Sequence, residues 1–251
     1  MANITSLVTA QWLKDRYLVG VDLTDDNNVP FPDAVFTGQI AAAISELEIM
    51  LDMVIDPITV TNEKHDYTAG VFDAPNYAPL MLHKRPVRAI SGVTCQWGQN
   101  AAFTLPESWF NMSGSAPDFS GQLTIIPTSS TVSTLSSYGL PWGYRDVATL
   151  WYRVTYTAGY ADPSTEIDPL MLDAIGLRAS MLALDIAGNL IAGAGIANKS
   201  VSLDSLSTSI GTTSSATNSG YGSTIISYRD RLKVILPILK AKYLRINMAI
   251  L

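Results

Sequence analysis

Few residues in this 251-residue chain are of the types that catalyse reactions or bind metals. Its two histidines, His65 and His83, and its single cysteine, Cys95, lie apart in the sequence. A zinc site needs about four Cys, His or carboxylate ligands, so none is expected. A Ser/His/Asp hydrolase built on either histidine is the remaining enzyme alternative. The chain has no G-x-S-x-G motif to expose a serine nucleophile, and both histidines are expected on the surface or in loops.

Two further motifs are incomplete. Asp22, Asp25 and Asp26 cluster, but the segment lacks the Gly and the Glu of a calcium loop, which favours a solvated turn. The segment 193–195, Gly-Ala-Gly, opens like a dinucleotide-binding loop, but Asn198 stands where the third glycine belongs. We therefore expect no catalytic residue, no metal and no cofactor, and the sequence predicts a protein that is not an enzyme.

The composition favours a subunit of a larger assembly. Hydrophobic residues make up 47% of the chain and charged residues only 15%, with a net charge of −6. Typical soluble domains carry about 25% charged residues, so neighbouring subunits are expected to cover part of this surface. The negative net charge argues against a surface that binds duplex DNA. The sequence also predicts no signal peptide and no membrane span, and the lone cysteine suits a reducing compartment.

Charge is unevenly distributed along the chain. Residues 1–73 carry twelve acidic and three basic residues, a net of −9, whereas residues 225–251 carry six basic residues and one acidic residue, a net of +5. This asymmetry is consistent with head-to-tail contacts between subunits or with docking of the C-terminal segment on an acidic partner. A helix whose outer face is basic for no such reason is the alternative.

Helical patterns occur at the beginning of the chain. Thr9 can cap a short helix from Ala10 to about Leu18. A longer helix is predicted from Asp33 to Asp56, ending at Pro57. Its apolar residues recur at steps of three and four along one face: Phe36, Ile40, Ala43, Leu47, Met50 and Val54.

Residues 58–160 change to a β pattern with long loops. Leu150, Tyr152, Val154 and Tyr156 alternate with more polar residues, which predicts a half-buried antiparallel strand. Shorter apolar runs at 58–60, 80–82 and 90–95 predict further strands. The segment is expected to form a β-rich insertion between helices.

Helices return in the last third of the chain. Asp168 and Pro169 form a strong start signal for a helix that Gly188 is expected to end. Residues 200–224 are rich in Ser and Thr and predict an arm that neighbours hold in place. A final helix is predicted over 224–247, kinked or split at Pro237.

These patterns together predict an α+β fold, a helical bundle with an inserted antiparallel β-rich domain and an extended C-terminal arm plus helix. The expected divisions are 1–57 for the first part of the bundle, 58–165 for the β-rich insertion, 166–199 for a bundle helix, 200–224 for the Ser/Thr-rich arm and 225–251 for the last helix and docking tail.

Four stretches in this order resemble the head–tail connector (adaptor) proteins of tailed bacteriophages. They are VTAQWLKDRYLV with the acidic loop and FPDAVFTGQIAAAISELEIMLDM, then LMLHKRPVRAISGV, then WYRVTYTAGYADPSTEIDPLMLDAIGLRASMLAL, and finally the Ser/Thr-rich arm with its last helix. They cover about two thirds of the chain. Many connector subunits are about half as long, so the role of the 96–144 loops is left open.

The resemblance implies a homo-oligomeric ring, usually of twelve copies, in the neck of a virion that assembles in the host cytoplasm. Its expected partners are the portal protein, a tail-side neck or stopper protein and other copies of itself, with DNA as a transient contact in the lumen and no membrane. The residues expected to contact the portal or a neighbouring subunit lie in the arm and the tail. They are Val201, Leu203, Leu206, Ile210, Tyr243, Arg245, Ile246, Met248, Ile250 and Leu251.

Two alternatives remain besides the hydrolase. One is another neck component, such as a stopper or tail-completion protein, or a capsid-associated protein. The other is a carbohydrate-binding virion module that uses Trp97, Trp109 or Trp142, unless these aromatic side chains fill a core.

Overall fold

The computed structural model describes residues 4–24, 27, 29–68, 71, 77–96, 103–112, 116–126, 147–161, 167–192, 198–203, 206–211 and 221–243. The chain divides into two compact units. The helical unit comprises Ala2–Leu51 and Ser164–Lys242, and the β unit comprises Asp52–Pro163 with Tyr243–Leu251 and Met1. The predicted α+β class, with a β-rich insertion in a helical bundle, is confirmed. The finer domain boundaries stay a prediction.

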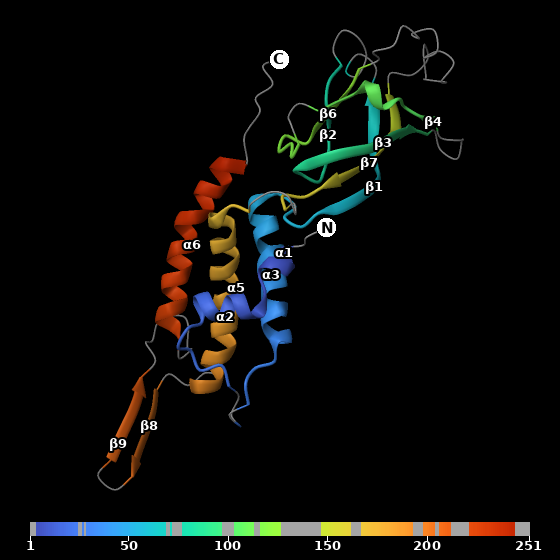
Figure 1. The fold of residues 1–251 in the computed structure, drawn as a ribbon. Helices are drawn as coiled ribbons and strands as arrows, with labels where there is room; N and C mark the ends of the chain where they lie inside the picture. Colours follow the sequence, from blue (N-terminus) through green and yellow to red (C-terminus); the bar gives the residue numbers. More distant parts are fainter. Residues whose placement is uncertain are drawn as a thin grey trace, which may run out of the picture. The chain divides into compact units, whose positions relative to one another are not determined.

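Three long helices form the body of the helical unit (Figure 1). They are α3 (Asp33–Leu51), α5 (Pro169–Ala192) and α6 (Gly222–Tyr243), and the short helices α1 (Ile4–Leu7) and α2 (Ala10–Tyr17) pack on them. An ion pair from Arg178 of α5 reaches Glu46 of α3, and another joins Asp173 of α5 to Arg231 of α6 at 2.7 Å. Helix α5 therefore contacts α3 through one side and α6 through another.

The helix caps predicted at Thr9 and Asp168 are confirmed. The Thr9 side chain accepts a hydrogen bond from the Trp12 N–H at 3.1 Å, and Asp168 Oδ1 accepts one from the Leu170 N–H at 2.9 Å. Each satisfies a backbone donor that the first turn of a helix leaves without a partner. Asp168 also uses its other oxygen to bind Lys242 Nζ at 2.7 Å.

The predicted ends of two helices are wrong, and a predicted split in a third does not occur. Helix α3 ends at Leu51 rather than Asp56, because Asp52 adopts a left-handed backbone (φ 48°) and Val54 pairs its backbone with Arg85 and Tyr160. Helix α5 continues past Gly188 to Ala192. Pro237 lies inside α6, so the predicted split does not occur, and buried Ile235 and Leu239 anchor the helix on both sides. The predicted kink stays a prediction.

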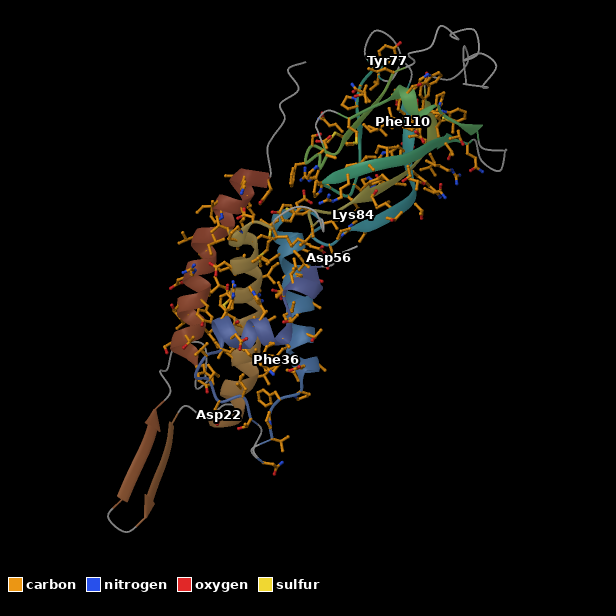
Figure 2. All side chains as sticks on the ribbon, viewed as in Figure 1. Asp22, Phe36, Asp56, Tyr77, Lys84 and Phe110 are labelled. Atoms are coloured by element: carbon orange, nitrogen blue, oxygen red, sulfur yellow. The ribbon has the colours of Figure 1, made fainter. Side chains whose placement is uncertain are left out.

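The composition of α3 is apolar enough, over a sufficient length, to cross a membrane. In the structure most of the apolar stripe predicted from its sequence packs inside the helical unit, and Phe36 at its start is fully buried (Figure 2). The prediction is wrong for Met50, which is 39% exposed, and Val54 lies beyond the end of the helix. The buried positions are Phe36, Ile40, Ala43, Ile44, Leu47 and Leu51. Such a composition is typical of a core helix in a globular unit, whose apolar face packs against other elements.

The β unit contains two antiparallel sheets around one core. The first has the order β1-β7-β3-β4, with β1 (Ile58–Thr68), β7 (Val147–Ala158), β3 (Val87–Cys95) and β4 (Phe103–Thr104). The second has the order β2-β6-β5, with β2 (Leu80–Met81), β6 (Gln122–Ile125) and β5 (Phe110–Met112), which follows the 3₁₀ turn η1 (Glu107–Trp109). Val93, Leu123, Val154 and Tyr156 are fully buried between them.

Strand β7 matches its predicted alternation over most of its length. Tyr152, Val154 and Tyr156 are buried, as expected, but Leu150 is half exposed and its neighbour Trp151 is buried instead. Leu150 has a left-handed backbone (φ 53°), and the pairing with β1 shifts between His65 and Tyr67. A bulge of this kind moves the alternation by one position, so the prediction for Leu150 is wrong.

The described part of the Ser/Thr-rich arm is a β-hairpin. Strands β8 (Asn198–Leu203) and β9 (Leu206–Gly211) pair in antiparallel register from Asn198↔Gly211 to Leu203↔Leu206. The arm predicted over 200–224 is thus paired with itself in this part, whereas 212–220 lie outside the described residues.

Candidate interaction surfaces

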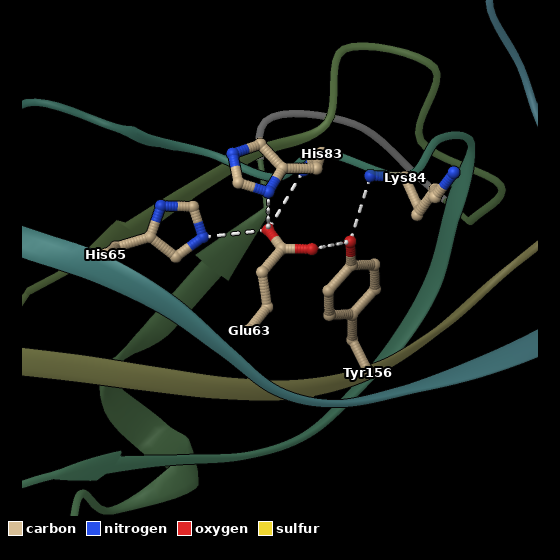
Figure 3. A network of polar contacts seen from close by, with 5 residues as sticks. All are labelled: Glu63, His65, His83, Lys84 and Tyr156. Atoms are coloured by element: carbon tan, nitrogen blue, oxygen red, sulfur yellow. Dashed lines mark hydrogen bonds and ion pairs between the residues drawn. The ribbon is translucent and has the colours of Figure 1, made fainter. Parts of the chain in front are cut away.

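A polar cluster around Glu63 brings several titratable side chains of the β unit together (Figure 3). Glu63 lies on β1, and its side chain is only 7% exposed. One carboxylate oxygen lies 2.8 Å from His65 Nε2 and accepts the His83 N–H at 2.9 Å. The other accepts the Tyr156 hydroxyl at 2.6 Å, and Tyr156 in turn accepts the Lys84 N–H at 2.9 Å. The cluster ties β1, β7 and the turn before β3 together.

Opposing effects set the pKa values of this cluster. Burial raises the pKa of Glu63. Hydrogen bonds from Tyr156, the His83 backbone and His65 together lower it by more than burial raises it, so the pKa lies below its usual 4.5. Burial and the bond to this carboxylate raise the pKa of Tyr156 above its usual range. Glu63 is therefore ionised and Tyr156 is protonated at neutral pH. Their hydrogen bonds to the backbone of His83 and Lys84 hold the turn before β3 against strands β1 and β7.

The two histidines have different environments. The His83 side chain is 71% exposed, as predicted, but the His65 side chain is 11% exposed on β1, so the expected surface position of His65 is wrong. Their rings lie 5.3 Å apart. Cys95 is buried, and burial raises the pKa of its thiol to about 12, which keeps it protonated and unreactive at neutral pH.

Replacing Glu63 with glutamine is expected to lower the free energy of unfolding by about 2 kcal/mol at pH 7. The variant loses charge-assisted hydrogen bonds inside a buried cluster. Because the folded-state pKa of Glu63 is lowered, its contribution is complete above about pH 4.5 and is lost as the pH falls through the folded-state pKa. Urea unfolding at pH 7 and pH 3.5 should show the difference from wild type shrinking at the lower pH.

The exposed Glu107 provides the matched control in the same unit. Its replacement with glutamine should change stability by no more than about 0.5 kcal/mol at either pH. A loss at Glu63 that is the same at both pH values would show that its charge does not matter.

The hairpin β8–β9 pairs two strands in which apolar and polar residues largely alternate in the sequence. Its register pairs Leu203 with Leu206, Val201 with Thr208 and Lys199 with Ile210, so the four predicted docking residues of the arm take alternate positions of the ladder. The positions between them are Asn198, Ser200, Ser202, Ser207, Ser209 and Gly211.

Of the predicted docking residues in the tail, the structure describes Tyr243. This residue is 8% exposed, stacks on Phe119 at 5.2 Å between ring centroids and has its hydroxyl 3.1 Å from that of Tyr160. It is a packed aromatic residue of the β unit and offers little free surface. Arg245, Ile246, Met248, Ile250 and Leu251 lie outside the described residues, and the docking role of all these residues stays a prediction.

The incomplete acidic motif and the tryptophans of the sequence have the following positions. Asp22 accepts hydrogen bonds from Thr24 within its own turn, while Asp25 and Asp26 fall outside the described residues. Trp109 is buried in the β-unit core and offers no surface for stacking on a sugar. Trp97, Trp142 and the segment 193–195 are also outside the described residues.

Two surfaces of the helical unit were not predicted. Ile49 of α3 is 81% exposed, and Val234 and Ile238 of α6 are 65% and 49% exposed. The spacing of the buried residues identifies the inner face of each helix, but it does not tell which outer positions could bind a partner. An isoleucine or valine opposite the buried stripe is the sequence signal that could have identified these outer surfaces.

Comparison with known proteins finds similar chains among solved structures. No protein-family model matches the sequence, and no curated protein matches it. The chain is similar to a chain of the virion of a native gene transfer agent particle, with 12% identity, a TM-score of 0.44 and coverage of 72% of this chain and 79% of that chain. It is also similar to a chain of the neck of an empty gene transfer agent particle, computed with C6 symmetry. The identity is 13%, the TM-score is 0.38, and the match covers 91% of this chain and 92% of that chain.

Proposed function

We propose that the protein is a structural subunit of a virion neck, a head–tail connector that assembles into a ring. The hairpin β8–β9 carries this proposal. A two-stranded sheet is marginally stable by itself in water, and the strands of this one contribute the apolar residues Val201, Leu203, Leu206 and Ile210 at alternate positions of the ladder. Such a hairpin is stabilised when a neighbouring surface covers it, which is the property of an assembly arm.

The sequence resemblance to phage connectors agrees with this function. Its first stretch corresponds to α2 and α3, its second to β2 and β3, and its third to β7 and α5. Within these stretches, Asp168 and Gly159 have defined structural roles, since Asp168 caps α5 and Gly159 allows a close backbone approach. The resembling residues therefore support the framework of the subunit.

The finer features of the proposal follow from the same resemblance. The ring would contain about twelve copies, with the portal protein on one side and a tail-side neck protein on the other. The hairpin and residues 244–251 would contact a neighbouring copy or the portal. DNA would pass through the lumen with weak contacts, and the chain would perform no catalysis.

Replacing Leu203 and Leu206 with serine is the test of this function. Both residues are apolar and pair directly across the hairpin. We expect the variant to keep the wild-type circular dichroism spectrum and thermal midpoint of the subunit body. In sedimentation velocity, wild-type protein should form a large assembly, and the variant should remain at the 27.1 kDa of one chain.

The matched control changes a polar pair of the same hairpin. Ser200 and Ser209 also pair directly, and their replacement with alanine should leave assembly unchanged. If the leucine variant assembles as well as wild type, the arm has no assembly function and the proposal loses its main support.

A further inference from the structure

Two basic side chains face each other on the outer side of the four-stranded sheet. Lys64 of β1 pairs directly with Arg153 of β7, and residues that pair directly share one face of a sheet. The preceding pair, Glu63 with Val154, belongs to the opposite face, which packs in the core of the β unit. On the outer face Lys64 is exposed and Arg153 is half-buried. Like charges placed directly opposite each other destabilise a sheet.

Neither of these two cations is neutralised within the part of the chain that the structure describes. No carboxylate there forms an ion pair with Lys64 or with Arg153. Asp66, two residues along β1 from Lys64, uses its Oδ1 to accept the Leu150 N–H at 2.7 Å. The Nε of Arg153 is buried and has no acceptor among the described residues, which costs free energy. The guanidinium therefore lacks a partner that an oxyanion would supply.

The two cations continue into a row of hydroxyl groups that crosses the sheet. Strands β1, β7, β3 and β4 lie side by side in this order (Figure 1). Arg153 pairs with Thr94 of β3, and Thr94 pairs with Thr104 of β4. Lys64, Arg153, Thr94 and Thr104 therefore form one row on the outer face, about 14 Å long at the usual spacing of strands. All four side chains can donate hydrogen bonds.

The neighbouring rows of this outer face carry small side chains. They are Thr155 with Gly92, and Thr157 with Thr59 and Ala89. These rows offer none of the large aromatic or aliphatic anchors on which protein partners depend for binding energy. Arg, Lys and Thr are side chains that commonly bind the phosphates of nucleic acids. A flat face with two cations, hydroxyl donors and small neighbours is thus suited to a phosphate backbone rather than to a protein.

We propose that the outer face of this sheet binds the phosphates of a DNA backbone, with Lys64 and Arg153 as its cationic contacts and Thr94 and Thr104 as hydroxyl donors. A phosphate between the two cations offsets their repulsion and gives the guanidinium an acceptor. Two cations in a chain of net charge −6 make the contact of one copy weak and sensitive to salt. The inference rests on the proposed function for the source of the phosphates, and it names the surface by which that ring would meet DNA.

Two variants that each remove one cation test this surface. Lys64→Gln and Arg153→Gln keep long polar side chains and lose one positive charge each. Lys84→Gln is the matched control, because the exposed Lys84 lies on the other side of the same sheet, where its N–H binds the hydroxyl of the buried Tyr156. Fluorescence anisotropy of a labelled DNA duplex, measured over a series of salt concentrations, gives the dissociation constant and its salt dependence. Thermal unfolding checks the fold, and native mass spectrometry gives the number of copies.

We expect wild type and Lys84→Gln to bind the duplex with the same affinity and each site variant to bind it about tenfold more weakly. The slope of the logarithm of the binding constant against the logarithm of the salt concentration should fall by about one for each charge removed. Lys64→Gln should raise the thermal midpoint at low salt, because it removes the repulsion from Arg153. All variants should assemble as wild type does, since none of these changes touches the β8–β9 hairpin.

Three results would overturn this surface. The first is unchanged DNA binding by both site variants. The second is binding of poly-glutamate as tight as that of the duplex and lost in the same variants, which would assign the face to an acidic protein. The third is displacement of the duplex by inorganic phosphate at the concentration of the DNA phosphates, which would reduce the face to a site for a free anion.

The outcomes also separate this surface from the proposed function. Wild-type protein that assembles into a ring but binds no DNA would overturn the surface and leave the ring proposal intact. Monomeric chains whose DNA binding depends on Lys64 and Arg153 would overturn the ring and uphold the surface. Monomeric chains that bind no DNA would overturn both.

Discussion

Replacing Gly159 with alanine is expected to lower the free energy of unfolding of the β unit by about 3 kcal/mol or more. Gly159 follows β7 with φ 146°, a conformation that residues with a side chain rarely adopt. A Cβ atom here would stand 2.6 Å from Pro57 Cα and 2.9 Å from Pro57 N. These contacts are to backbone, so no side-chain rotation relieves them.

The same position carries hydrogen bonds that a backbone shift would disturb. The Gly159 N–H donates to the Pro86 carbonyl at 2.9 Å, and its carbonyl accepts from Arg88 Nε at 2.6 Å. Gly92 of β3 is the matched control, because a Cβ atom there meets nothing within 4 Å. Chemical unfolding should show a large loss for Gly159→Ala and no loss for Gly92→Ala. Equal stability of the two variants would contradict the close approach to Pro57.

Replacing Gly176 with alanine is expected to destabilise the helical unit by about 2 kcal/mol. A Cβ atom on this α5 residue would stand 2.5 Å from Tyr17 Cζ and 2.9 Å from the Tyr17 hydroxyl oxygen. The Tyr17 ring cannot move away cheaply, since its hydroxyl donates to Asp173 at 2.8 Å and its carbonyl accepts from Tyr228 at 2.7 Å. The cost of overpacking exceeds the gain in helix propensity.

Gly38 provides a control of opposite sign in the same unit. This residue lies in α3, and a Cβ atom there meets nothing within 4 Å. Gly38→Ala should raise the free energy of unfolding by as much as about 1 kcal/mol, because alanine favours the helix and restricts the unfolded chain. Thermal unfolding of both variants measures the contrast. A stabilised Gly176→Ala would show that Tyr17 does not pack on α5 as described.

Local signals in the sequence were sufficient to predict where several elements begin. Thr9 and Asp168 start helices because their side chains satisfy donors within the same turn, and this needs no distant partner. The apolar periodicity of α3 identified its buried face, with Phe36, Ile40 and Leu47 all in the core. The alternation in β7 similarly identified Tyr152, Val154 and Tyr156 as buried.

Two of the incorrect predictions depend on contacts between residues far apart in the sequence. Helix α3 stops early because Val54 binds Arg85 and Tyr160, neither of which is near it in the chain. The alternation around Leu150 shifts because Asp66 of β1 accepts the Leu150 N–H at 2.7 Å. His65, by contrast, is partly buried beside Glu63, which is two residues away on the same bulged strand. Single-residue patterns do not contain this information.

The candidate interaction surfaces were predicted only in part. The spacing of Val201, Leu203, Leu206 and Ile210 indicated a docking segment, but their pairing in a hairpin depends on the strand register. Predicting the outer faces of α3 and α6 requires knowing which sides of these helices α5 covers. The uneven charge of the chain was visible in the sequence, and the structure places five of the six basic residues of 225–251 on α6, the helix that also carries the exposed Val234 and Ile238.

Cryo-electron microscopy of the assembled protein tests the central claim most directly. The account predicts a closed ring of identical copies in which each chain contacts its two neighbours through different surfaces, with the β8–β9 hairpin covered by protein. The resemblance to phage connectors sets the expected number at about twelve. A particle population of 27.1 kDa monomers, or an assembly in which the hairpin face is left in solvent, would contradict the account.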